Sequence, residues 1–216
     1  MMHLQKEIII NNSSFIRLSG WSFIIGAFCF YLFFPLYYLN STGLNVDRFM
    51  AGWGISYDLS FYWSPILLAI GMFGLWARYG EIVGKLGKAF LLISPVGILI
   101  TFFGLTQANI YEQDAVVSSA GVLMLMTCLA LFGVMALITK PLPRWNWLPI
   151  IAGVGFPAFF LYSAIAGTMN ESSFLNQFAI LVLIVTIQFI ALVILGYMLQ
   201  ANVTEETKIS QQGQPA

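Results

Sequence analysis

The chain has 216 residues, of which 59% are apolar and only 8% are charged, and its formal net charge is zero. A soluble domain carries about 25% charged residues because its surface must be hydrated. This composition excludes an ordinary soluble domain and predicts an all-α, polytopic membrane protein whose main partner is the lipid bilayer. The absence of a net positive charge argues against nucleic acid as a partner.

Six apolar runs are long enough to cross a membrane. A helix needs about 20 residues to span the hydrocarbon core, and the strands of a barrel would instead alternate apolar and polar residues. The runs are continuous, so we predict six transmembrane helices. In chain order they cover residues 17–39, 58–77, 88–106, 115–138, 147–167 and 174–199.

The first run is interpreted as a retained span rather than a signal peptide. It is long, rich in Phe, Tyr and Leu, and no site of small residues follows it, whereas signal peptides have shorter apolar regions. The predicted organisation is a cytoplasmic N-terminal tail over 1–16 and one membrane domain over 17–200. The polar tail over 201–216 is expected to be disordered.

The second run carries small residues at helical spacing. Ser60, Ser64, Gly71 and Gly74 follow one face of the predicted helix. Small side chains let helix backbones approach closely, and this replaces the hydrophobic driving force that lipid removes. The stripe therefore predicts a helix-packing face, which could also mediate homo- or hetero-oligomers.

The segment GLWARYGEIVGKLGKAF, which joins the second and third runs, contains four charged residues. Basic residues collect in the short cytoplasmic loops of membrane proteins. When successive loops are placed on alternate sides, only Arg48 lies outside, and both termini are predicted to be cytoplasmic. The basic residues predicted inside are Lys6, Arg17, Arg78, Lys85, Lys88, Lys140, Arg144 and Lys208.

Two short motifs resemble those of a loose group of uncharacterised bacterial six-span membrane proteins. The first motif covers Gly74 to Arg78 and continues at Gly84 to Gly87, in the predicted inner loop. The second, Leu142-Pro143-Arg144-Trp145, precedes the fifth run. The resemblance implies a six-span layout over most of the chain, and it implies no activity.

Two glutamines lie on the sixth run, where a polar side chain in hydrocarbon needs a partner. Gln188 is in mid-span, and Gln177 lies eleven residues earlier, on nearly the same helix face. The favoured interpretation is an interhelical or dimer-interface hydrogen bond. The alternative is a polar contact inside a central cavity.

A second polar group is predicted at the outer surface, where it could form a mouth. It consists of Asp58, Tyr62, Asn109, Glu112 and Asp114. To act as general acids or bases, these carboxyl groups would need burial. The simpler interpretation is that they are solvated loop residues.

Three glycines suggest an internal repeat of three tandem helical hairpins. Gly71, Gly133 and Gly196 recur near the ends of the even-numbered spans. The alternative is that any six-span chain with both ends inside shows a similar alternation of inner and outer loops, without a repeat.

Three functional hypotheses remain open. The first, which we favour, is a non-enzymatic membrane protein that acts through helix–helix or lipid contacts, as an accessory subunit. The second is a small carrier or channel for a neutral or hydrophobic solute, and the third is a lipid-modifying enzyme at the outer interface. No cofactor is expected, because the chain has one histidine and lacks nucleotide-binding, zinc-hydrolase and serine-hydrolase motifs.

Overall fold

A computed structural model describes residues 2–41, 57–111, 116–142, 145–166 and 174–212. Over these residues it contains helices and no strand, so the predicted all-α fold class is confirmed. The helices are α1 (Met2–Ser41), α3 (Tyr57–Tyr79), α4 (Gly84–Tyr111), α5 (Val116–Thr139), α6 (Leu148–Ala166) and α7 (Phe174–Gln212).

Four of these helices are long and apolar enough to cross a membrane over their described residues. The spanning stretches are Ser13–Leu32, Gly84–Gly104, Ser119–Thr139 and Val182–Ala201. The described apolar part of α6, Leu148–Tyr162, is shorter. The chain is therefore a helical protein suited to membrane insertion.

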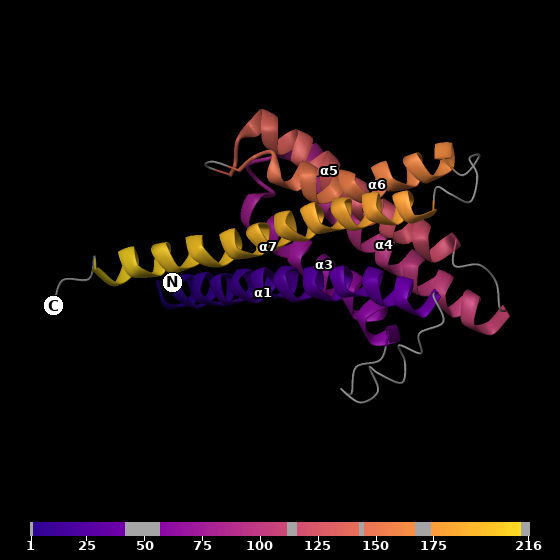
Figure 1. Cartoon of the computed structure of the whole chain (residues 1–216). Helices are drawn as coiled ribbons and strands as arrows, with labels where there is room; N and C mark the ends of the chain where they lie inside the picture. Colours follow the sequence, from indigo (N-terminus) through magenta and orange to yellow (C-terminus); the bar gives the residue numbers. More distant parts are fainter. Residues whose placement is uncertain (1, 42–56, 112–115, 143–144, 167–173, 213–216) are drawn as a thin grey trace.

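The six helices pack as a ring. Each helix packs against the next one along the chain, and α7 packs against α1. Figure 1 shows α1 and α7 side by side, with the start of α1 and the end of α7 at the same end of the molecule. The helix pairs of the suggested hairpins, α1–α3, α4–α5 and α6–α7, are each in contact, and so are the pairs between them, α3–α4, α5–α6 and α1–α7.

The first and last helices extend well beyond a membrane thickness. They contain 40 and 39 residues, which at about 1.5 Å per residue is roughly twice the hydrocarbon core. The helix through Gln212 differs from the disordered tail expected over 201–216. Residues 201–212 contain no Gly or Pro and include the helix formers Glu, Lys and Gln, and α7 ends directly before Gly213.

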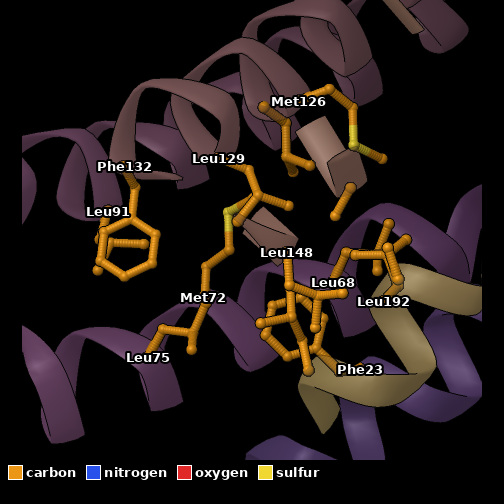
Figure 2. Close-up of a cluster of buried hydrophobic side chains, with 14 of the residues drawn as sticks. Phe23, Leu68, Met72, Leu75, Leu91, Met126, Leu129, Phe132, Leu148 and Leu192 are labelled. Atoms are coloured by element: carbon orange, nitrogen blue, oxygen red, sulfur yellow. The ribbon is translucent and has the colours of Figure 1, made fainter. Parts of the chain in front are cut away.

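All six helices contribute to one apolar core. Figure 2 shows its largest members, which fill the space between the helices at that level. They are Phe23 from α1, Leu68, Met72 and Leu75 from α3, Leu91 from α4, Met126, Leu129 and Phe132 from α5, Leu148 from α6 and Leu192 from α7.

A short turn, residues 80–83, connects α3 to α4. The backbone N–H groups of Ile82 and Val83 both donate to the carbonyl of Tyr79. Gly84 then begins α4 with a φ of 74°, a left-handed conformation that glycine adopts without a steric cost. Lys88 from the first turn of α4 pairs with Glu81 in the turn and lies over the ring of Trp76 on α3. These contacts connect the start of α4 to the turn and to the end of α3.

Candidate functional site

Gln188 on α7, the glutamine that the sequence places in mid-span, is fully buried at 0% exposure. Its amide nitrogen Nε2 donates a hydrogen bond of 2.7 Å to the backbone carbonyl of Ala152 on α6. The same nitrogen lies 3.4 Å from the sulfur of Met126 on α5. Gln188 therefore connects three helices, and we call this meeting point the α5–α6–α7 junction.

The sequence of α6 explains how its neighbours come so close. A Cβ atom at Gly153 would lie 2.5 Å from the carbonyl oxygen of Met126, so only glycine admits α5 at this distance. A Cβ atom at Gly155 would lie 3.1 Å from Oε1 of Gln188, on the side of α7. These glycines precede Pro157, which has no N–H group and so leaves the carbonyl of Gly153 without its usual helical donor.

The hydrogen bonding of Gln188 is only half satisfied. Its carbonyl oxygen Oε1 is buried and accepts no hydrogen bond from any described residue. An unpaired buried acceptor costs about 1–3 kcal/mol relative to its hydrated state. The amide thus stabilises the helix contact through its nitrogen, while its oxygen is buried in the junction without a donor from the described residues.

The stripe of small residues on α3 packs against α1. The hydroxyl of Ser64 donates 3.2 Å to the carbonyl of Gly26, a hydrogen bond between the two helices. A Cβ atom at Gly71 would meet the ring of Phe23, and one at Gly74 would meet Ser19. The helix bearing Ser60 is described, but the Ser60 side chain lies outside the described residues.

Helices α1 and α7 come together at a pair of glycines. A Cβ atom at Gly20 would lie 2.6 Å from the carbonyl oxygen of Gly196, and the reverse distance is the same. The sequence analysis did not identify Gly20 or its reciprocal contact. Its only signal is a glycine near the start of an apolar run, which many helices share.

The three glycines of the suggested repeat occupy different interfaces. Gly71 faces α1, the helix before its own, whereas Gly133 faces Ile150 on α6, the helix after its own. Gly196 faces α1 by closing the ring of helices. Equivalent repeats would place all three against corresponding neighbours, so these contacts lend the repeat no support.

The side chains of the predicted outer mouth lie outside the part of the chain that the structure describes, so the mouth stays a prediction. Asp58 and Tyr62 lie on α3 and Asn109 on α4, but their side chains are outside the described residues, as is that of Gln177 on α7. Glu112 and Asp114 fall outside the described ranges altogether. Across the described part of the chain, no group of three or more His, Cys, Asp or Glu residues could hold a metal ion.

The comparisons with known proteins assign no relative to this chain. No family model, curated protein or solved structure matches it.

Proposed function

We propose that this protein is a non-enzymatic, multi-pass protein of a bacterial cell membrane that acts through helix–helix contacts as an accessory subunit. The observation that carries the proposal is the burial of Gln188, whose Nε2 donates to the backbone of α6. A mid-span polar residue that fastens two helices has a packing role, whereas a transport residue must meet its cargo.

The proposal places both termini in the cytoplasm. The start of α1, the α3–α4 turn, the α5–α6 connection and the end of α7 lie at one end of the bundle, as the course of the chain in Figure 1 indicates. Eight of the nine basic residues belong to these segments, and such residues favour the cytoplasmic side.

The outward surfaces of α4 and α5 are the proposed contact faces. α4 is the least buried of the four spanning stretches, and it exposes Leu92, Val96, Leu99 and Phe103 at helical spacing. On α5, Thr127 is exposed near the middle of the span. A hydroxyl at that depth gains from a partner on a neighbouring helix, because lipid tails offer none.

The test is the mass of the protein extracted from its native membrane in a mild detergent. We expect a complex larger than one chain, and we expect Thr127→Val to lower the yield of that complex. Thr186→Val is the matched control, because the hydroxyl of Thr186 donates to Val182 on its own helix. A monomeric wild-type protein, or equal losses in both variants, would contradict the proposal.

The unpaired Oε1 of Gln188 favours a second candidate, a carrier for a small neutral solute. Such a solute could donate the missing hydrogen bond during its passage. Swelling of proteoliposomes in glycerol would test this candidate. Uptake above that of empty liposomes, lost in Gln188→Leu, would support the carrier over the accessory subunit.

A further inference from the structure

The start of α4 and the end of α5 expose apolar and basic side chains next to each other. Leu86 in the first turn of α4 is 63% exposed, and Ile138 in the last turn of α5 is 70% exposed. Lys85 precedes Leu86, Lys140 follows directly after α5, and both lysines are exposed. We call these four residues the α4–α5 edge.

The two halves of the α4–α5 edge lie at the same end of neighbouring helices. α4 and α5 pack against each other, and a Cβ atom at Gly87 would lie 3.4 Å from the Cβ atom of Met135. Lys85 comes shortly before Gly87, and Lys140 comes shortly after Met135. Because a helix rises about 1.5 Å per residue, each lysine lies within about two turns of this contact.

The α4–α5 edge continues the outward surfaces of both helices. Lys85 is separated from Leu92 and Val96 by spacings that return to nearly the same side of a helix, and both of these apolar residues are exposed. Ile138 has the same relation to the exposed Thr127 on α5. The edge is therefore the place where two membrane-facing surfaces end in positive charge.

The charges of the α4–α5 edge are not balanced by the described part of the chain. Glu81 is the acidic side chain that the structure describes near this edge, and it pairs with Lys88. The first turn of α4 contains no acidic residue. Lys85 and Lys140 thus present positive charge for which no described carboxylate is the partner.

Lys140 occupies a position at which helices commonly have glycine. Its φ is 52°, a left-handed conformation that a residue with a Cβ atom adopts at a steric cost. Pro141 follows and cannot continue the helix. A lysine here places a charge at the end of α5 in spite of that cost, and backbone strain of this kind is a reason to look for a function.

We propose that the α4–α5 edge binds the headgroup of an anionic phospholipid. The ammonium groups of Lys85 and Lys140 attract the headgroup, and the lipid's acyl chains cover Leu86 and Ile138, whose exposure to water would be unfavourable. This site is independent of the proposed accessory role, because the subunit contact is placed around Thr127 in mid-span.

The test is native mass spectrometry of the intact protein, released from micelles that contain equal amounts of phosphatidylglycerol and phosphatidylcholine. A basic residue near an anionic lipid surface contributes about a fivefold preference. With two such residues we expect the wild-type protein to retain phosphatidylglycerol over phosphatidylcholine by about 20-fold.

Lys85→Gln and Lys140→Gly should each lower that ratio about fivefold. Glycine adopts the φ of Lys140 without a steric cost, so Lys140→Gly removes the charge and should not weaken the fold. The matched control is Arg17→Gln, which removes an exposed charge from α1, a helix that packs against α3 and α7, and should leave the ratio unchanged. Retained protection of the Cys128 thiol in a Cys29→Ala background would show that each variant is folded.

Equal retention of the two lipids by the wild-type protein would overturn the proposal. So would equal losses in Lys85→Gln, Lys140→Gly and Arg17→Gln, because the preference would then follow total charge rather than the α4–α5 edge. If one of the two edge variants does not fold, the other decides, and an unchanged ratio in it rejects the lipid site.

Discussion

The contacts of α1 and the α5–α6–α7 junction hold helices together in different ways. At α1, the backbones meet directly through Gly20 and Gly196, and the hydroxyl of Ser64 is satisfied by the carbonyl of Gly26. At the junction, glycines also bring helices close, but a proline removes one donor and Gln188 leaves its Oε1 unpaired.

The comparison separates two properties of helix contacts in a membrane protein: how strongly they hold the helices together, and whether their polar groups are hydrogen-bonded. Burial of apolar area gives little advantage to helix association in lipid, so close packing and interhelical hydrogen bonds must provide it. The α1 contacts use both, through Gly20, Gly196 and the hydroxyl of Ser64. At the junction, by contrast, Oε1 of Gln188 is buried without a donor from the described residues.

Enlarging Gly20 should give the largest loss of stability. In Gly20→Leu the new Cβ would lie 2.6 Å from the carbonyl of Gly196, and neither backbone can move without separating α1 from α7. We expect a loss of about 3 kcal/mol or failure to fold, at the upper end of overpacking effects. The measurement is thermal unfolding followed by maleimide labelling of Cys128, which is buried, in a Cys29→Ala background.

The matched control for Gly20→Leu is Ala120→Leu, which adds a similar volume at an exposed position of α5. If both variants unfold at the wild-type temperature, the glycine contact does not hold the ring closed.

Changes at Gln188 should separate its packing from its hydrogen bonding. Gln188→Ala removes both and leaves a cavity, for which we expect a loss of about 2 kcal/mol. Gln188→Leu keeps most of the volume, removes the bond to Ala152 and also removes the unpaired Oε1, so we expect a change within about 1 kcal/mol. The same thiol assay measures both, and a loss in Gln188→Leu as large as that in Gln188→Ala would mean that the hydrogen bond dominates.

The smallest effect is expected for the serine that joins α1 to α3. Ser64→Ala removes one interhelical hydrogen bond, which is worth about 0.6 kcal/mol in membrane proteins. Ser94→Ala is the control, because that buried hydroxyl donates to Leu91 on its own helix. Equal unfolding temperatures for the two variants would show that the bond to Gly26 adds nothing specific.

Most of the fold could be predicted from the sequence because the length of an apolar run is a local property. The predicted run over 58–77 corresponds to Tyr57–Tyr79, and the run over 115–138 corresponds to Val116–Thr139. The largest differences are at the start of α1 and the end of α7, where the chain is polar but contains no residue that would stop a helix.

The candidate site was harder to predict because half of it is backbone. The sequence singles out Gln188 as a polar residue in mid-span, but its partner is the carbonyl of Ala152, and every residue has a carbonyl. Gly153 and Gly155 mark α6 as a helix whose backbone other helices can approach closely, and Pro157 removes the helical donor of the carbonyl of Gly153. That pattern was available in the sequence, but it does not say which helix approaches.

The sequence by itself therefore determined the membrane class, the all-α fold and the position of each apolar helix, since these depend on hydropathy and length. The tertiary structure alone decided that α7 closes on α1 through Gly20 and Gly196, and that Gln188 faces α6 and α5. The physical reason is that contacts between helices far apart in the chain depend on how all six pack at once. Neither the order of neighbours nor the unpaired state of Oε1 can be obtained from any one segment.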